Sequence, residues 1–465
     1  MEMQFRKSPR YVAGALLVTL TLIITACGGG TTSPAPATPG GAATPAATPA
    51  GSPAESPGES PGESPAAAEC PPSAEGQRVE MWSPLTGPDG DEMSRLADQY
   101  TSENDMGITV AHVAQPEYLQ KLEASAAAQQ LPAMTVVRVT NVAQLAVRNV
   151  LKPFSEEALG IVGHIEADVP EHTWGGGEYN GQRYSVPLDV HPLVMYYNKD
   201  MFEAAGLDEP GTEPMSAEDF EAALTALEES GEMPISVGTA FNGATLFQTL
   251  IVQYGGSIAN ADGTQATYNS PQGVQALEYV NGLRQRSPDV SGPGDPEVNE
   301  VKQGNAAIVF HGPWHISDLS TLDFIGFAPF PQIGDTYAVW GGSHQLGMTS
   351  EDPAVQAAAA CWTAWLSDNS VEWAAAGQVP VRVAARESPD LETKAPAIAA
   401  VAEASADAAI ILPQVAALEG ALWDEFGPVV DGVLLGEVTD IPGALNEAQA
   451  RSQQKLEENA EQFAP

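Results

Sequence analysis

This chain contains few positively charged residues. Its 465 residues include 19 lysines and arginines against 61 aspartates and glutamates, which gives a formal net charge of −42. A surface with this balance repels nucleic-acid phosphates and anionic membranes. We therefore expect no nucleic-acid partner and interpret the acidity as a source of solubility.

The chain also lacks the HExxH and P-loop motifs of common catalytic sites. A secreted glycosidase would need two carboxylates, but 61 acidic residues always supply some pair at a suitable separation. Such a pair carries no information, so we expect no enzyme and no cofactor.

Long apolar runs are limited to the start of the chain. A basic stretch containing Arg6, Lys7 and Arg10 precedes the apolar segment Tyr11–Ala26, which is short for a membrane span. The segment ends in IITAC, and Cys27 closes it. This resembles the lipobox of bacterial lipoproteins, in which signal peptidase II cuts before the cysteine and the thiol carries diacylglycerol. The resemblance implies a signal peptide at residues 1–26 and a lipid anchor at the extracytoplasmic face of the cell membrane.

Large apolar residues are missing from the next segment, which consists almost only of Gly, Ala, Pro, Ser, Thr and Glu. Such a composition cannot build a core, so residues 27–76 are predicted to be the lipidated cysteine and a disordered tether. Cysteine is scarce, and after Cys27 only Cys70 and Cys361 remain. Thiols outside the cell are able to pair, but the sequence leaves it open whether these two do.

From residue 77 onward, strand-like and helix-like segments alternate. The first strands are predicted at Arg78–Pro84, Ile108–Val113 and Met134–Val139, with helices at 91–102 and 116–130 between them. This alternation is typical of a parallel sheet with crossover helices, and the final third of the chain is largely helical. The predicted fold class is therefore α/β.

The stretch Tyr184–Phe202 is the one around which we expect the chain to be organised. It alternates between polar and apolar residues and then enters the apolar run Val194–Tyr197, as a strand does on entering a buried sheet. Asp189 and His191 face the same side of that strand, because side chains repeat every two residues. Two polar groups just before a new core begins indicate a ligand cleft between two lobes.

Several longer segments follow one another between residues 78 and 463. They are VEMWSPLTGPDG, YNGQRYSVPLDVHPLVMYYNKDMFEAAGL, NAAIVFHGPWHI, FAPFPQIG, WGGSHQLGMT and LWDEFGPVVDGVLLGEVTDIPGALNEAQA. Together they resemble the extracellular solute-binding proteins of ABC transporters, in the family that includes maltose- and multiple-sugar-binding proteins. The resemblance implies a type II periplasmic-binding-protein-like fold, with an N-terminal lobe at 77–190 plus 345–385 and a C-terminal lobe at 191–344 plus 386–465. We expect a monomer that captures a sugar or oligosaccharide, closes by hinge bending and delivers it to ABC permease subunits.

A sugar presents hydroxyl groups and flat C–H faces, so its site needs aromatic rings beside hydrogen-bonding groups. Trp314 and Trp423 match aromatic positions of the family, with a core tryptophan as the alternative for each. Asp189 and His191 match polar contacts on the hinge strand, with a solvated hinge pair as the alternative. Further candidates are Trp82, at the end of the first strand, then Gly341, Gly342 and Ser343, where backbone amides approach the ligand, and finally Phe241, Asn242, His344 and Arg382.

The sequence departs from the maltose-binding pattern at one place. Where maltose-type members carry a Trp and an Asp, this chain has Val137 and Thr140, with Arg138 and Asn141 nearby. We therefore expect that the ligand is not maltose held by a Trp and an Asp at these positions. Arg138 leaves room for an acidic or phosphorylated sugar, with an ordinary surface arginine as the alternative.

Histidines gather in the segments predicted to form the cleft, where His191, His311, His315 and His344 lie. The four-residue spacing of His311 and His315 suits zinc on a helix. Pro313 and the strand context argue against that geometry, so no metal site is expected. Two other functions stay open: a tethered sugar-sensing or adhesion receptor without a role in transport, and a secreted glycoside-active enzyme.

Overall fold

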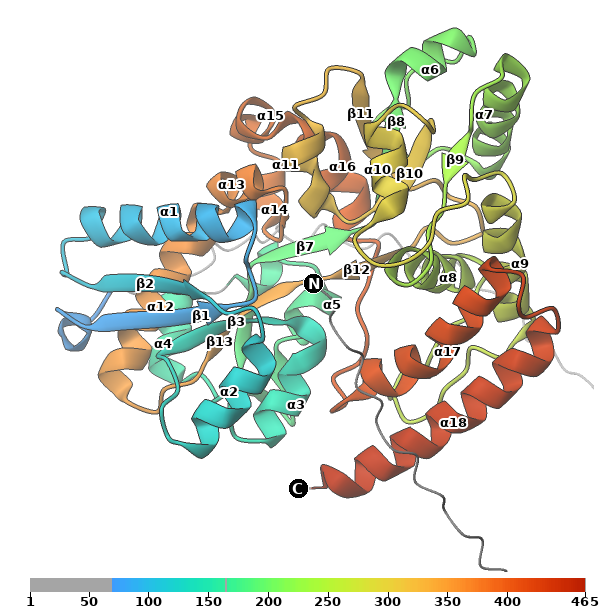
Figure 1. The fold of residues 1–465 in the computed structure, drawn as a ribbon. Helices are drawn as coiled ribbons and strands as arrows, with labels where there is room; N and C mark the ends of the chain where they lie inside the picture. The colour runs from blue at the N-terminus through green and yellow to red at the C-terminus, as the bar shows by residue number, and fades with distance from the viewer. Residues whose placement is uncertain (1–68, 164, 465) are drawn as a thin grey trace, which may run out of the picture. The chain divides into compact units, whose positions relative to one another are not determined.

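The computed structural model describes residues 69–163 and 165–464 (Figure 1). The predicted signal peptide, the lipidation site Cys27 and most of the predicted tether lie outside these residues. The described part of the chain forms two α/β lobes, each with its own sheet and its own apolar core. Within it, no helix combines the length and the apolar character that a membrane span requires.

The sheet of the first lobe has the strand order β2-β1-β3-β13-β6. Its strands are β1 (Arg78–Ser83), β2 (Thr109–Ala114), β3 (Met134–Arg138), β6 (Ser185–Pro187) and β13 (His344–Met348). β1 pairs in parallel with β2 and β3, whereas β13 runs antiparallel to β3 and β6. The sheet is thus mixed rather than purely parallel, because β13 returns into it from the second lobe.

Helices and 3-10 turns surround this sheet. They are η1 (Pro72–Ala74), α1 (Pro88–Glu103), α2 (Tyr118–Ala127), η2 (Val139–Asn141), α3 (Val142–Val147), α4 (Glu156–Val162), η3 (Glu166–Asp168), α5 (Glu171–Gly175), α12 (Pro353–Asp368), α13 (Ser370–Trp373) and η5 (Ala374–Ala376). A small hairpin joins β4 (Glu178–Tyr179) to β5 (Gln182–Arg183). α1 begins a turn earlier than its apolar pattern indicates, because Pro88 suits the first helical turn and Asp89 and Asp91 follow in it.

A disulfide joins Cys70 to Cys361, with their Cα atoms 5.8 Å apart. Cys361 lies on α12, which packs against η1 just after Cys70. The bond links positions 291 residues apart, a pairing that the sequence left open. It fastens the start of the described chain to a helix of the first-lobe core.

The sheet of the second lobe has the strand order β11-β8-β10-β9. Its strands are β8 (Val194–Asn198), β9 (Ile235–Ser236), β10 (Ile308–His311) and β11 (Ile325–Pro329). Its helices are α6 (Lys199–Ala204), α7 (Ala217–Ser230), α8 (Phe241–Gln253), α9 (Pro271–Arg284), α10 (Pro296–Lys302), η4 (Pro313–His315), α11 (Ile316–Leu319), α14 (Val383–Arg386), α15 (Pro389–Lys394), α16 (Pro396–Ala406), α17 (Leu418–Leu434) and α18 (Ile441–Gln462). Side-chain caps begin two of these helices: Asn198 accepts a hydrogen bond from the Met201 N–H, and Ser216 accepts one from the Asp219 N–H.

Strands that cross between the lobes form a third sheet, in the order β14-β7-β12-β15. These strands are β7 (Asp189–Pro192), β12 (Val339–Gly342), β14 (Val379–Pro380) and β15 (Ala409–Ile410). β6, β7 and β8 follow one another directly, so the stretch that we expected to organise the fold carries the chain from one sheet to the other. Val190 packs into the first core and Leu193 into the second. The lobe boundaries expected from the sequence stay predictions.

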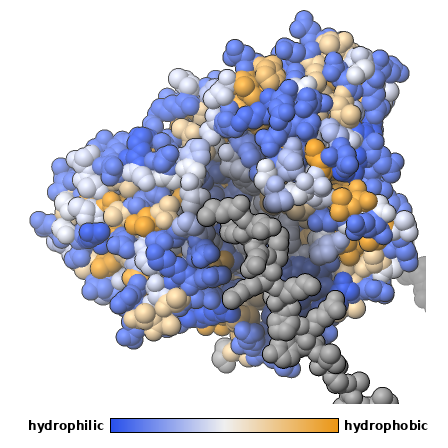
Figure 2. All heavy atoms as spheres, viewed as in Figure 1, coloured by the Kyte–Doolittle hydropathy of each residue, from blue (hydrophilic) through white to orange (hydrophobic). Residues whose placement is uncertain are grey.

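The face shown in Figure 2 is mostly hydrophilic, with hydrophobic residues scattered in small groups. This agrees with the acidic composition of the chain.

Candidate functional site

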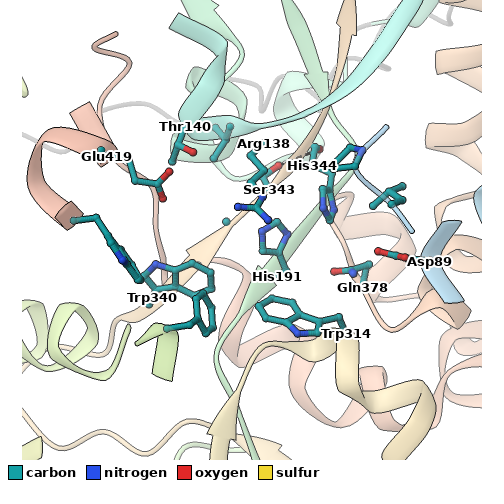
Figure 3. Close-up of a pocket in the computed structure, with 18 of the residues that line it drawn as sticks. Asp89, Arg138, Thr140, His191, Trp314, Trp340, Ser343, His344, Gln378 and Glu419 are labelled. Atoms are coloured by element: carbon teal, nitrogen blue, oxygen red, sulfur yellow. Dashed lines mark hydrogen bonds between the residues drawn. The ribbon is translucent and has the colours of Figure 1, made fainter. Parts of the chain in front are cut away.

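A cavity of about 580 Å³ lies where the crossing strands meet the two lobes (Figure 3). Its lining comes from the end of β3, from β7, β12 and β13, and from α8, η4 and α17 of the second lobe. The lining residues are Pro84, Leu85, Asp89, Arg138, Val139, Thr140, His191, Phe241, Trp314, Trp340, Gly341, Gly342, Ser343, His344, Gln378, Glu419, Gly420, Trp423 and Asp424. The volume falls within the range of small-molecule sites.

Aromatic side chains form one wall of this cavity, with Phe241 at its centre. The ring centroid of Phe241 lies 5.6 Å from that of Trp314, 5.0 Å from Trp340 and 6.1 Å from Trp423. All three indoles are partly exposed. We call these four residues the aromatic wall.

Glycines give the cavity its shape at two points. A Cβ atom on Gly312 would approach the Trp314 ring to 2.0 Å, so only glycine lets the indole fold back over the end of β10. A Cβ atom on Gly342 would lie 2.2 Å from His191 Nε2. Glycine at this position therefore leaves room for the imidazole beside β12.

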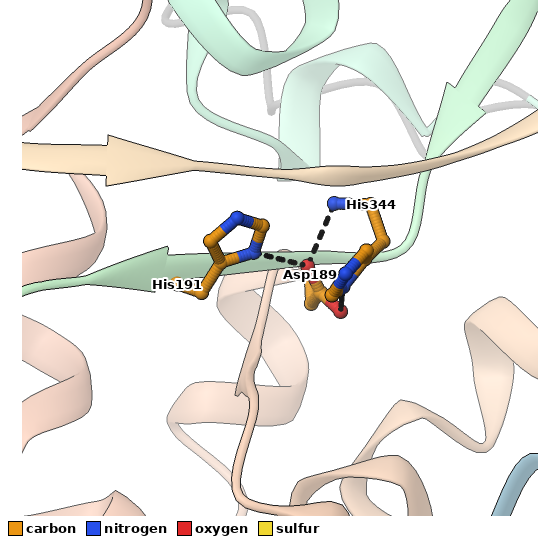
Figure 4. A group of neighbouring side chains, drawn as sticks. All are labelled: Asp189, His191 and His344. Carbon is orange, nitrogen blue, oxygen red and sulfur yellow. Dashed lines mark hydrogen bonds and ion pairs between the residues drawn. The ribbon is translucent and has the colours of Figure 1, made fainter. Parts of the chain in front are cut away.

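Asp189 is the centre of a hydrogen-bonded cluster at the crossing (Figure 4). Its Oδ1 accepts from the His344 backbone N–H at 2.9 Å and lies 3.3 Å from His191 Nδ1. Its Oδ2 accepts from His344 Nδ1 at 2.8 Å and from Trp373 Nε1 at 2.9 Å. Because a carboxylate only accepts, both imidazoles donate to it through Nδ1, which leaves Nε2 of each ring for other partners.

The charges of this cluster follow from its burial. Burial alone raises the pKa of Asp189, but the charge of His344 and the hydrogen bonds from both histidines outweigh it and hold the pKa below its usual value. Burial lowers the pKa of His191 to about 4, and the hydrogen bond with Asp189 offsets only part of this effect. His191 is therefore neutral at physiological pH.

Arg138 is the only lysine or arginine among the described residues that line the cavity. It ends β3, it is exposed, and no described residue forms an ion pair or a side-chain hydrogen bond with it. Asp89, Glu419 and Asp424 also line the cavity, so its charged groups are of both signs. Asp89 Oδ1 accepts from the Gly90 N–H at 2.8 Å, and Asp424 lies 3.6 Å from Lys455.

Two further polar groups of the lining have no hydrogen-bond partner among the described residues. These are the Thr140 hydroxyl and the Gln378 amide oxygen, both of which are buried atoms. Buried polar groups are normally paired, so two unpaired ones facing a cavity indicate sites where a ligand forms hydrogen bonds.

The structure brings most of the sequence-predicted residues to this cavity. The predicted residues that line it are Trp314, Trp423, His191, Gly341, Gly342, Ser343, Phe241 and His344. Their role in binding stays a prediction, because their place in the lining is a matter of geometry alone.

The other predicted residues lie outside the lining, each for a physical reason. Asp189 has no exposed surface and its oxygens are already bonded to neighbours, so it positions His191 and His344 instead. Trp82 packs into a first-lobe cluster, where its Nε1 donates to Glu80. Asn242 bridges the Gly238 N–H and the Phe310 carbonyl, and Arg382 is bonded to Asp168, Ser367 and Asp368.

Sequence reasoning missed Trp340 and Glu419 in this lining. Trp340 directly precedes Gly341 and Gly342, which were predicted, so its neighbours were a usable signal. Glu419 lies four residues before Trp423 on α17 and therefore shares a helix face with it. Gln378 and Asp89 carried no comparable signal, because their segments approach the cavity only through the tertiary fold.

Comparison with known proteins agrees with this geometry. The model of a family described as bacterial extracellular solute-binding protein matches residues 95–400. An sn-glycerol-3-phosphate-binding periplasmic protein of Pectobacterium atrosepticum is 23% identical over 332 residues, covering 66% of this chain and 74% of that protein. A maltodextrin-binding protein of Bacillus subtilis is 22% identical over 301 residues, covering 60% of this chain and 66% of that protein.

Solved structures match the fold over more of the chain. The cyclic alpha-maltosyl-1,6-maltose binding protein of Arthrobacter globiformis is 25% identical with a TM-score of 0.67, covering 82% of this chain and 99% of that one. UgpB of Mycobacterium tuberculosis, in complex with glycerophosphocholine, is 19% identical with a TM-score of 0.69, covering 82% and 98%. The two lobes and their crossing strands are therefore the architecture of these binding proteins.

Proposed function

This chain belongs to the bacterial extracellular solute-binding proteins, and from that membership we propose that it captures a sugar or oligosaccharide in the cavity between its lobes for an ABC importer. The family places the protein outside the cytoplasm. The observation that carries the proposal is the aromatic wall, which shares one cavity with two imidazoles and with unpaired polar groups.

The chemistry of the cavity suits a polyhydroxylated ring. Aromatic rings of this kind pack against the C–H face of a sugar. The Nε2 atom of the neutral His191 ring accepts from hydroxyl groups, as does the amide oxygen of Gln378, while the Thr140 hydroxyl both donates and accepts. A sugar held in this way makes contacts with both lobes, so it stabilises the closed arrangement that a permease recognises.

The remaining elements of the proposal concern the setting of the protein. A lipid on Cys27 would hold it at the outer face of the membrane, where the permease subunits of the importer receive the solute. The cavity is lined by residues of one chain, which supports a monomer. The absence of an HExxH or P-loop motif supports binding without catalysis.

A thermal-shift screen of mono- and oligosaccharides on the purified full chain tests this function. A ligand that binds only the native state stabilises it by about 2.7 kcal/mol at a hundred times its Kd, which raises the Tm. Calorimetry with the stabilising sugar then measures the affinity of the wild type and of Trp314→Ala. A screen with no stabilising sugar, or an unchanged affinity in Trp314→Ala, would refute the proposal.

Arg138 favours a second candidate, a phosphorylated polyol. An unpaired guanidinium in a cavity matches a phosphate group, because its N–H groups bind two oxygens at once. Because two similar proteins are named for, or solved with, sn-glycerol-3-phosphate and glycerophosphocholine, these two compounds are the probes for this candidate. If glycerol 3-phosphate or glycerophosphocholine stabilises the protein and Arg138→Gln abolishes the effect, this candidate replaces the neutral sugar.

A further inference from the structure

A second cluster of histidines and carboxylates lies in the second lobe, outside the cavity lining. Asp295 and Glu297 come from the start of α10, His311 ends β10, and His315 ends η4. Candidate ligand atoms of Asp295, His311 and His315 all lie within 4.8 Å of one another. The sequence contains these residues in separate segments, and the fold brings them to one point.

The side chains of this cluster approach one another without forming hydrogen bonds. His315 Nε2 lies 3.3 Å from Asp295 Oδ2, and His311 Nε2 lies 3.5 Å from Asp295 Oδ1 and 3.6 Å from Glu297 Oε1. Their length or their orientation keeps these pairs from being hydrogen bonds, so both Nε2 atoms and Glu297 Oε2 have no such partner among the described residues. His311 is 1% exposed and Glu297 is 2% exposed.

The separations of these atoms match a metal site. Ligands bound to Zn²⁺ at about 2.0 to 2.1 Å in a tetrahedron lie roughly 3.3 Å from one another. The mixture of imidazole nitrogen and carboxylate oxygen also suits zinc and related divalent transition metals, whereas calcium and magnesium take oxygen ligands.

The backbone around the cluster is arranged to hold these groups. In the sequence, Pro313 argues against a shared site for the two histidines. In the structure Pro313 instead starts a 3-10 turn that brings them together. The rings of His311 and His315 consequently lie 4.5 Å apart. The Glu297 carboxylate lies against Gly238, where a Cβ atom would approach Oε2 to 2.1 Å, so glycine leaves the space that it occupies.

We propose that Asp295, Glu297, His311 and His315 bind one divalent transition-metal ion, with Zn²⁺ the best match to this ligand set. The ion reaches the site from the surface, because the side chains of Asp295 and His315 are 39% and 20% exposed. It fixes His311, whose ring lies 5.2 Å from Phe241 and 5.3 Å from Trp314. The metal is thus a structural support behind the aromatic wall.

Titration of the chelator-stripped, untagged full chain with Zn²⁺, followed by calorimetry, tests this site. We expect one ion per chain, and we expect His315→Gln and Asp295→Asn each to weaken binding at least about tenfold. The matched control is His112→Gln, since this histidine lies in the first lobe and is hydrogen-bonded to Ser83 and Ser94. Its affinity for Zn²⁺ should equal that of the wild type.

Co²⁺ provides a readout that needs no variant. Bound to the wild-type chain, it should give the strong visible absorption of a tetrahedral site, and Zn²⁺ should displace it. Absence of Zn²⁺ binding at micromolar concentrations overturns the proposal. So does equal binding by the wild type, His315→Gln and Asp295→Asn, because the ion would then lie elsewhere.

Discussion

The two histidine–carboxylate clusters of this molecule have similar compositions and different surroundings. In the first, Asp189 lies between His191 and His344 and also accepts from the Trp373 indole and a backbone N–H. In the second, Asp295 lies beside His311 and His315, and no described donor completes the arrangement. The comparison teaches that the groups around a cluster, rather than its members, decide whether it is a hydrogen-bonded support or a metal site.

The largest effect that this comparison predicts is on folding stability. Asp189→Asn removes the charge that two histidines and an indole N–H share in a fully buried place, which should lower the free energy of unfolding by about 3 to 5 kcal/mol. The matched change Asp295→Asn affects a partly exposed group, so in metal-free protein it should cost less than about 1 kcal/mol. Urea unfolding of both variants measures the difference, and equal losses would break the contrast between the clusters.

The next prediction concerns pH. His191 has a folded-state pKa of about 4, so between that pH and its usual pKa near 6.5 the unfolded chain binds a proton that the folded chain does not. Stability should therefore fall as the pH drops from about 6.5 to about 4, by at most roughly 3 kcal/mol from this residue. The groups around it are Asp189 and His344, with Arg138 contributing a charge that lowers the pKa further.

Comparison of the wild type with His191→Gln isolates this contribution. Burial also lowers the pKa of His112 and His172, but these residues act equally in both proteins and cancel. Denaturant unfolding at a series of pH values should show a shallower decline for the variant. Parallel curves would mean that His191 is not held neutral by its surroundings.

Stabilisation by Zn²⁺ should depend on the cluster at Asp295 and not on the cluster at Asp189. At a hundred times its Kd, Zn²⁺ should stabilise the wild type by about 2.7 kcal/mol, and this gain should vanish in His315→Gln. It should persist in His191→Gln, because Asp189 and its histidines already satisfy one another. Thermal unfolding with and without Zn²⁺ makes the measurement, and a loss of the response in both variants would contradict the distinction.

Trp314 is a neighbour of both clusters, with ring centroids 6.1 Å from His191 and 5.3 Å from His311. Trp314→Ala should weaken binding of the sugar identified in the screen by about 2 kcal/mol, since a central aromatic contact is lost. Trp82→Phe, a change in a buried indole outside the cavity, should leave the affinity unchanged. Calorimetry of both variants decides whether the aromatic wall contributes to binding.

Much of the fold could be predicted because its signals are local. The caps at Asn198 and Ser216 and the alternation before Val194 depend on residues close in sequence. Short elements such as α14 and β15 carried no such pattern, because their positions depend on contacts with distant strands. The antiparallel entry of β13 into the first sheet was likewise a matter of topology.

Many residues that line the cavity could be named from the sequence, whereas the contacts among them could not. Alternation indicated that Asp189 faces the same side as His191, but it did not show that Trp373 and His344 cover that carboxylate. Whether His311 and His315 lie close together was predicted from their spacing by assuming either a helix or a strand. The 3-10 turn after Pro313 belongs to neither, and so the proximity of the two rings was missed.

If the protein is held through the lipid proposed on Cys27, the bond between Cys70 and Cys361 has a mechanical consequence. A pull applied ahead of Cys70 passes through a covalent link into α12 and so bypasses β1. Tension that would otherwise peel the first strand from its sheet is borne by a helix in the interior of the lobe. Reduction of this bond would therefore expose β1 to unzipping under force.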